Sequence, residues 1–255
     1  MRGCNLVYGM RRRLFRRGLK KRILYGEIGR VGGSISLAGY GLKMAYPDEL
    51  IWAHQINEIF CDDCYRVGTL PPVCRVIDGG ANIGSFSLFV KWLRPLAHII
   101  AIEPSASNRA YLQRNLTDNR AQGIEMLPVA LGAAAGEAWI SGVTSDGLRT
   151  GSQGSERVKV VNLGDIIREP VDLLKLDIEG AELDVLCGAG KALAMVKRAV
   201  IEYHHRNGQL LQVPELLTVL RDQGFTRFQI TDMRDFPTRK PEANIHCGLI
   251  HAWRV

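Results

Sequence analysis

The pattern of hydrophobic positions changes character at Pro71-Pro72. Beyond this point, short apolar runs alternate with stretches in which apolar residues recur at helical spacing, which is typical of a parallel sheet with crossover helices. The predicted strands are Arg75–Ile77, His98–Ile102, Glu125–Pro128, Leu173–Leu176, Arg198–Tyr203, Arg227–Ile230 and Cys247–Ala252. The predicted helices are Gly84–Trp92, Ser107–Asn119, Ala181–Cys187 and Pro214–Gln223. We therefore expect an α/β fold built around one sheet.

Before Pro71 two segments show a helical pattern. Residues 6–25 place apolar side chains at three- and four-residue steps between arginines and lysines, and Asp48–Asp63 is a second amphipathic segment. We predict a basic amphipathic arm and a helical lid segment over residues 1–70, followed by the main domain over 71–255. Gly142–Ser155 is rich in Gly, Ser and Thr and is predicted to be a mobile loop.

The formal net charge of +7 is concentrated at the start of the chain. Residues 1–30 hold ten Arg and Lys and one acid, and the other 225 residues hold 23 basic and 25 acidic side chains, a net of −2. A near-neutral body argues against a nucleic-acid partner, which would need a basic face on the folded domain. An amphipathic basic arm over residues 1–24 can lie on an anionic membrane, dock on an acidic partner, or stay solvated.

The cysteines and the expected cellular compartment give little information about function. The six cysteines of this chain do not resemble a disulfide framework, and Cys61-Asp-Asp-Cys64 lacks the second ligand pair of a structural zinc site. No apolar run is long enough for a membrane span or a secretory signal. We expect a cytoplasmic protein, with membrane association at the cytoplasmic face through the arm as the alternative.

The most informative motif ends the first predicted strand and runs Asp78-Gly79-Gly80-Ala81-Asn82-Ile83-Gly84-Ser85. Small residues let the backbone approach a nucleotide-like ligand closely. A carboxylate at the strand end would repel the pyrophosphate of a dinucleotide, but it would attract the ammonium and sulfonium groups of S-adenosylmethionine (SAM). The turn therefore favours SAM over NAD, and a turn that only packs strand on helix is the alternative.

An acid follows at the spacing expected for a ribose contact. Glu103-Pro104 ends the next strand, nineteen residues after Gly84, where a carboxylate can accept hydrogen bonds from ribose hydroxyls. Ala130 lies just past the third strand between apolar neighbours and is a candidate to pack on adenine. Asn115 and Asn119, on the helix between, are interpreted as ordinary helix-end polar residues.

Together these motifs resemble the FkbM-type SAM-dependent methyltransferases. The resemblance spans about Asp48 to Ala252, and its most specific segment is Lys175-Leu-Asp177-Ile-Glu179-Gly180-Ala-Glu182. It implies a Rossmann-like class I methyltransferase with a seven-stranded, mostly parallel sheet and an antiparallel last strand. It also implies methyl transfer, usually to oxygen.

Two strand ends supply candidate catalytic residues. Asp177 follows one strand, and Glu202-Tyr-His204 ends the next, so these side chains should meet at the carboxyl edge where open sheets bind ligands. His204 is the first choice of general base and Asp177 the second. Alternatively Asp177, Glu202 and His204 hold Mg²⁺, which would lower the hydroxyl pKa, or His204 is structural. Glu182 is interpreted as a helix-start acid favoured by the helix dipole.

The expected function is O-methylation of a hydroxyl on a sugar, a glycolipid or another small biosynthetic intermediate. Carboxyl or natural-product O-methylation and a non-catalytic SAM-binding scaffold are the alternatives. A nucleic-acid methyltransferase is disfavoured, because carboxylates stand where phosphates or bases would approach. The sequence leaves the acceptor and the oligomeric state open.

Overall fold

A computed structural model describes residues 33–37, 40–47, 55–141, 149–151, 154, 156–206, 212–231, 234–236 and 245–254. The chain divides into two compact units. One unit comprises Met1–Val73, Ala81–Ala97 and Ala106–Ile124, and the other comprises Cys74–Gly80, His98–Ser105 and Glu125–Val255. The predicted helix over residues 6–25 and most of the predicted loop Gly142–Ser155 lie outside the described residues.

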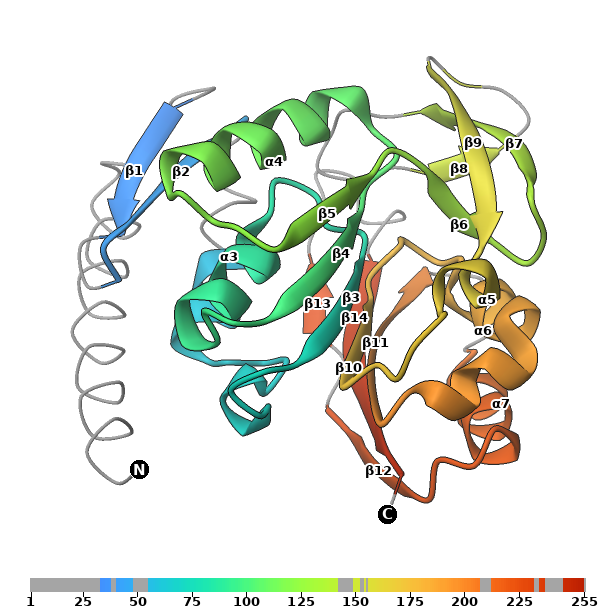
Figure 1. The fold of residues 1–255 in the computed structure, drawn as a ribbon. Helices are drawn as coiled ribbons and strands as arrows, with labels where there is room; N and C mark the ends of the chain where they lie inside the picture. Colours follow the sequence, from blue (N-terminus) through green and yellow to red (C-terminus); the bar gives the residue numbers. More distant parts are fainter. Residues whose placement is uncertain are drawn as a thin grey trace. The chain divides into compact units, whose positions relative to one another are not determined.

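The second unit is built on the predicted sheet. Its strands follow the order β12-β14-β11-β10-β3-β4-β5, with β10 beside both β3 and β11 (Figure 1). They are β3 (Arg75–Gly79), β4 (His98–Ile102), β5 (Ile124–Leu127), β10 (Leu173–Leu176), β11 (Arg198–Arg206), β12 (Arg227–Ile230) and β14 (Ile245–Trp253). The strands β4, β3, β10 and β11 run parallel, whereas β14 is antiparallel to both of its neighbours. The predicted α/β fold with an antiparallel last strand is confirmed. A short strand that was not predicted, β13 (Arg234–Phe236), also pairs with β14.

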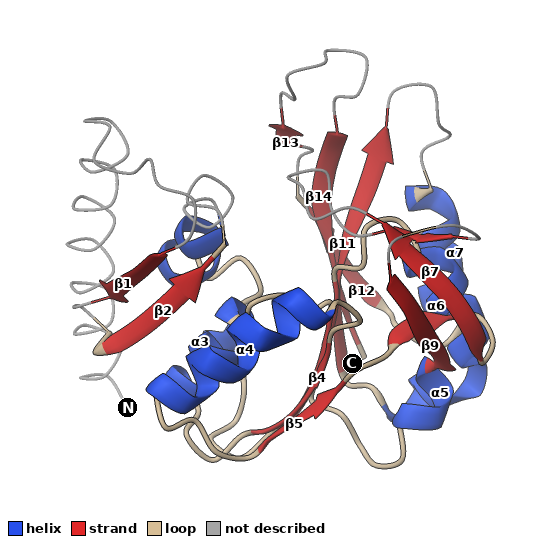
Figure 2. Cartoon of the chain, turned by 90° about the horizontal axis from the view of Figure 1, so that it is seen from above, coloured by secondary structure: helices blue, strands red, loops and turns tan. Residues whose placement is uncertain are grey.

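Burial explains why these segments form strands. All four residues of β10 are buried, and Leu174 and Leu176 belong to a core that includes Ile77 of β3 and Ile201 of β11. Continuous apolar runs are expected for strands covered on both faces. Helices α5 (Leu163–Ile166), α6 (Glu182–Ala189) and α7 (Val213–Asp222) lie together beside this sheet (Figure 2).

A second sheet of the same unit was not predicted. Its order is β6-β9-β7-β8, formed by β6 (Ala130–Gly132), β7 (Gly136–Ser141), β8 (Arg149–Gly151) and β9 (Glu156–Asn162). The prediction of a loop over Gly142–Ser155 is therefore wrong for Arg149–Gly151, which pairs with Trp139–Ser141. Backbone groups alone form this pairing, so a Gly- and Thr-containing segment can join a sheet without a hydrophobic pattern.

The first unit contains a hairpin and helices. They are β1 (Gly33–Leu37), β2 (Leu42–Tyr46), a π-helical segment (Asn57–Cys61), a 3-10 helix (Val67–Thr69), α3 (Ser85–Leu93) and α4 (Ala106–Asp118). The described part of the predicted helix Asp48–Asp63 thus contains a π-helical turn. Tyr40 contacts the rings of Phe60 and Trp92, and Phe60 contacts Phe89, so this unit has its own aromatic core. Among the described helices, none combines the length and apolarity that crossing a membrane requires.

Two asparagines attach the hairpin to α4. Asn115 is fully buried; its side chain accepts a hydrogen bond from the Ala45 amide (2.6 Å) and donates to the carbonyls of Ala45 (3.0 Å) and Ile83 (2.8 Å). Asn119 exchanges the same pair of bonds with the backbone of Lys43. The interpretation of both residues as ordinary helix-end polar groups is wrong, because their amides bond the edge of β2 as another strand would.

Candidate active site

The glycine turn begins in the second unit. Asp78 is fully buried in β3, and Gly80 has a φ of +77°. A Cβ atom on Gly80 would lie 1.8 Å from the carbonyl oxygen of Asp177, and the Gly80 amide donates to the Ile102 carbonyl at 3.0 Å. Gly79 is also closely covered, since a Cβ there would meet Leu176 at 2.7 Å. Glycine is thus required at position 80 by both its dihedral and its surroundings.

The rest of the turn belongs to the first unit. The Gly84 amide donates to the carbonyl of Ala81 at 2.8 Å, and Asn82 and Gly84 have φ values of +50° and +90°. Gly84 immediately precedes α3, and a Cβ on it would lie 2.5 Å from Leu112. Ser85 begins the helix, and its hydroxyl bonds the side chain of Gln55 at 3.4 Å. Positive φ angles at these positions match a turn selected for a tight strand-to-helix connection.

Glu103 and Ala130 occupy the expected strand ends of the second unit. Glu103 directly follows β4, is buried, and accepts a hydrogen bond from the Ser105 amide at 2.9 Å. Pro104 comes next in the chain, and Ala130 is the buried first residue of β6. Asp78 and Ala101 are register partners in β3 and β4, so the carboxylates of Asp78 and Glu103 leave neighbouring strands near their carboxyl ends. The roles of Glu103, Pro104 and Ala130 in cofactor binding stay predictions.

Lys175 is a buried cation that the sequence reasoning missed. Its side chain is 4% exposed; Nζ lies 3.2 Å from Oδ1 of Asp78 and 3.5 Å from Oδ2 of Asp177 and donates to the Gly80 carbonyl at 2.7 Å. Burial favours the neutral amine, but the two carboxylates outweigh burial and raise the pKa of Lys175. The available signal was a single lysine inside the apolar run Leu173-Leu-Lys-Leu176, beside a strand that ends in an acid.

His204 lies among three carboxylates. Its Nδ1 is 3.4 Å from Oε1 of Glu182, and its Nε2 is 3.8 Å from Oδ1 of Asp177 and 3.7 Å from Oε2 of Glu179. The strand ends thus bring Asp177 and His204 together, as predicted. Glu179, which was not chosen as a site residue, joins them from the segment that follows Asp177.

The backbone around Glu179 explains how its carboxylate reaches the histidine. Glu179 has a φ of +61°, in the left-handed region that a non-glycine residue rarely adopts. Oε1 of Glu182 accepts hydrogen bonds from the amides of Ile178 (3.0 Å) and Gly180 (3.2 Å), on both sides of Glu179. Glu182 therefore holds a strained turn in place as well as beginning α6, a larger role than the helix-start acid that we predicted.

The charges in this cluster are strongly coupled. Burial disfavours the charged imidazolium, but the 3.4 Å contact with the Glu182 carboxylate and the charges of Glu179, Glu182 and Asp177 outweigh burial and raise the pKa of His204 to about 10. Burial raises the pKa of Glu179 to about 7, against the opposing charge of His204. This differs from the prediction of a histidine that titrates near neutrality: His204 is protonated at pH 7, and Glu179 is the group that titrates there.

The same arrangement bears on the predicted metal. Asp177, Glu179 and His204 each offer a ligand atom, and these atoms lie within 4.8 Å of one another; Glu202, the third predicted ligand, is not in that set. Mg²⁺ prefers six oxygen ligands, and an imidazole must be neutral to bind a metal. Two carboxylates and one imidazole provide few of the oxygen ligands that Mg²⁺ prefers, so this set fits Mg²⁺ poorly. We therefore derive no step through a metal ion.

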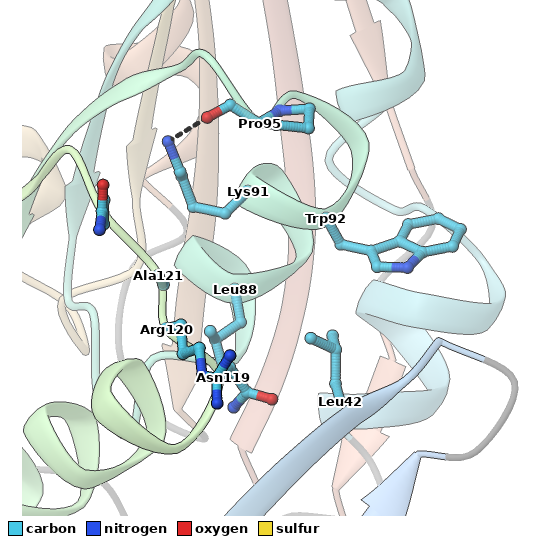
Figure 3. Close-up of a pocket in the computed structure, with 9 residues that line it drawn as sticks. Leu42, Leu88, Lys91, Trp92, Pro95, Asn119, Arg120 and Ala121 are labelled. Carbon is cyan, nitrogen blue, oxygen red and sulfur yellow. Dashed lines mark hydrogen bonds between the residues drawn. The ribbon is translucent and has the colours of Figure 1, made fainter.

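One hollow of about 310 Å³ lies in the first unit and contains none of the predicted site residues (Figure 3). Lys91 in its wall donates to the carbonyls of Pro95 (2.6 Å) and Ala97 (2.7 Å), and Asn119 bonds the backbone of Lys43. These polar groups tie the end of α3 and the hairpin into the fold. The hollow is therefore explained by packing.

A family model described as the methyltransferase FkbM domain matches residues 78–227, which include the glycine turn, Lys175 and His204. The chain belongs to the FkbM methyltransferase family. It is 32% identical over 210 residues to the methyltransferase sdnD of Sordaria araneosa, with 66% of this chain and 80% of that protein covered. It is also 32% identical over 211 residues to the 31-O-demethyl-FK506 methyltransferase FkbM of Streptomyces tacrolimicus, with 67% and 80% covered.

Solved structures agree on the fold. The crystal structure of M. jannaschii TYW2 in complex with AdoMet has a TM-score of 0.51 with this FkbM-family chain, at 12% identity, over 89% of this chain and 88% of that one. At this identity the likeness concerns the fold alone. Family membership makes the chain a SAM-dependent methyltransferase, as predicted, and the roles of Asp78, the glycine turn and Glu103 in binding SAM stay predictions.

Proposed function

We propose that this FkbM-family enzyme transfers the methyl group of SAM to a hydroxyl oxygen of a sugar, a glycolipid or another small biosynthetic intermediate. The observation that carries the proposal is the carboxylate pair Asp177 and Glu179, both of which face Nε2 of the protonated imidazole of His204. An alcohol must lose its proton as its oxygen is methylated, and this pair supplies a partly exposed acceptor for that proton. The relative from Streptomyces tacrolimicus is named for methylation at an oxygen.

Glu179 is the proposed general base. Its carboxylate is 29% exposed, so an acceptor can reach it, and a pKa of about 7 matches the requirement that a base be ionised at neutral pH yet basic enough to take a proton. Asp177 lies beside it and is 24% exposed. The positive charge of His204 stabilises both carboxylates and holds them in position for the hydroxyl.

The charge of the cluster favours hydroxyl over carboxyl acceptors. Four carboxylates interact electrostatically with one another or with His204 and Lys175: Asp177, Glu179, Glu182 and Glu202. The surroundings of the proposed base are therefore rich in negative charge. An acceptor carboxylate would be repelled there, whereas a neutral hydroxyl would not. We therefore place carboxyl methylation behind hydroxyl methylation.

The test is an assay with SAM carrying an isotopically labelled methyl group. Sugar nucleotides, glycolipids and carboxylic acids serve as acceptors, and mass spectrometry locates the label on each product. We expect label on hydroxyl oxygens, with kcat reduced at least a hundredfold in Glu179→Gln and unchanged in Asp184→Asn, an exposed acid on α6. Label found only as methyl esters would contradict the proposal, and so would an unchanged kcat in Glu179→Gln.

A further inference from the structure

Lys175 contacts the end of the sheet that carries Asp78. It is the register partner of Asp78 in the neighbouring strand, and its Nζ contacts Asp78, Asp177 and the Gly80 carbonyl. The other residues of β10 are leucines in the core. Removing an ion from water is unfavourable, so a fourth leucine would suit this strand better if packing were the only requirement.

The balance of charge explains what the lysine can do for the reaction. Asp78 and Asp177 would together place two negative charges at the end of the sheet, and Lys175 reduces that sum to one. Methyl transfer from SAM forms a carbon–oxygen bond, breaks the sulfur–carbon bond and leaves the bonding electrons on sulfur, so the positive charge of the sulfonium is lost. The proton of the acceptor hydroxyl passes to a carboxylate of the enzyme. Negative charge near the sulfur therefore stabilises the reactant more than the transition state, which slows the reaction.

We propose that Lys175 offsets the negative charge of Asp78 and Asp177, so that the site holds SAM without over-stabilising its sulfonium charge, and thereby sets the preference of the enzyme for SAM over its demethylated product. This inference rests on the proposed function, with the cofactor at the turn that follows β3. Lys175 acts in it as a tuning residue, through the potential of the site and not by touching the methyl group.

SAM and S-adenosylhomocysteine differ by one methyl group and one positive charge, so the ratio of their dissociation constants reports the potential at the sulfur. A variant that unfolds, or whose binding site changes shape, would bind both ligands more weakly to the same extent. The test measures both dissociation constants by calorimetry for the wild-type chain, Lys175→Met and the double variant Asp78→Asn/Lys175→Met. The single variant adds one net negative charge, whereas the double variant removes both members of the buried pair and leaves the net charge unchanged.

We expect Lys175→Met to shift the ratio at least threefold in favour of SAM and to lower kcat at saturating SAM at least tenfold. We expect the double variant to return the ratio to within twofold of the wild-type value, even though both ligands bind it more weakly. An unchanged ratio in Lys175→Met overturns the inference, as does an equal shift in the double variant. If Lys175→Met does not fold, Lys175→Gln, which is neutral and can still donate to the Gly80 carbonyl, is held to the same threefold threshold. Absence of SAM binding by the wild-type chain would instead contradict the proposed function.

Discussion

The side-chain amide of Asn115 donates a 2.8 Å hydrogen bond to the carbonyl oxygen of Ile83, inside the glycine turn. The same amide bonds both backbone groups of Ala45 in β2. One buried side chain of α4 therefore holds the hairpin and the predicted cofactor turn together within the first unit.

Replacing Asn115 with Leu should affect both stability and cofactor binding. Three buried backbone groups would lose their partner, at about 1–3 kcal/mol for each group that stays unsatisfied. We expect the free energy of unfolding in urea to fall by roughly 2–4 kcal/mol and the Kd for SAM, measured by calorimetry, to rise at least threefold. Asn119→Leu is the matched control, because Asn119 bonds Lys43 in β2 but does not contact the turn in any recorded bond. An equal rise in Kd in both variants would contradict a specific role for the Ile83 bond.

Gly80→Ala should be poorly tolerated. The new Cβ would overlap the carbonyl oxygen of Asp177, and alanine is strained at a φ of +77°. Neither conflict can be relieved by rotating a side chain, so we expect a destabilisation on the order of 3 kcal/mol in urea unfolding. Gly136→Ala, where a Cβ would meet no atom within 4 Å, should change stability by less than about 0.5 kcal/mol. A Gly80→Ala protein as stable as Gly136→Ala would show that the turn can relax.

The pH dependence of kcat should follow Glu179. A base acts only when ionised, and because the pKa of Glu179 is about 7 we expect kcat to rise as pH increases through 7. Glu179→Gln should remove this rise and lower kcat by about 10²–10⁴-fold. A pH–rate profile of both proteins checks the prediction. If the rise persists in Glu179→Gln, another group is the base.

The stability of the folded chain should decrease as pH rises, because His204 loses its proton. Its pKa is about 10 in the folded chain and near 6.5 when unfolded, so its stabilising effect is fully present below pH 6.5 and is lost as pH rises through 10. We expect the Tm of the wild-type chain to fall between pH 7 and 10 more steeply than that of His204→Gln. Parallel curves for the two proteins would mean that His204 is not held as an imidazolium.

Chelation should leave activity unchanged. Because the cluster around His204 offers Mg²⁺ only two carboxylates and an imidazole, we expect kcat after dialysis against EDTA to stay within twofold of the untreated value. A loss of activity that added Mg²⁺ restores would make Asp177, Glu179 and His204 a metal site after all.

The sequence was most informative where burial or a backbone dihedral angle restricts the residue type at a single position. The apolar runs of β3 and β10, the strand-end Asp78 and the glycine turn were all predicted, because burial and backbone dihedrals constrain residue type at each position. Asp177 and His204 were expected to meet, because they lie near the carboxyl ends of neighbouring parallel strands, although β11 continues past His204 to Arg206.

What the sequence did not reveal depends on distant partners. The role of Lys175 depends on its contact with Asp78, a residue of another strand. The role of Asn115 depends on its hydrogen bonds with the backbone of Ala45. Glu179 resembles an ordinary helix-start acid until Glu182 holds its backbone in the left-handed region. Of the small sheet, β6 and β8 are too short to show a period, whereas β7 and β9 are six and seven residues long and were missed without such a reason. The proposed membrane contact of residues 1–24 stays a prediction.

The division of the chain into units has a practical consequence for engineering this enzyme. The backbone leaves the second unit between Gly80 and Ala81, returns between Ala97 and His98, and crosses twice more before Glu125. Neither unit is a continuous stretch of polypeptide, so neither can be expressed as a single truncated fragment or exchanged with a relative by one fusion point. Chimaeras between family members must replace several short segments at once, and the junction between Gly80 and Ala81 would fall inside the glycine turn.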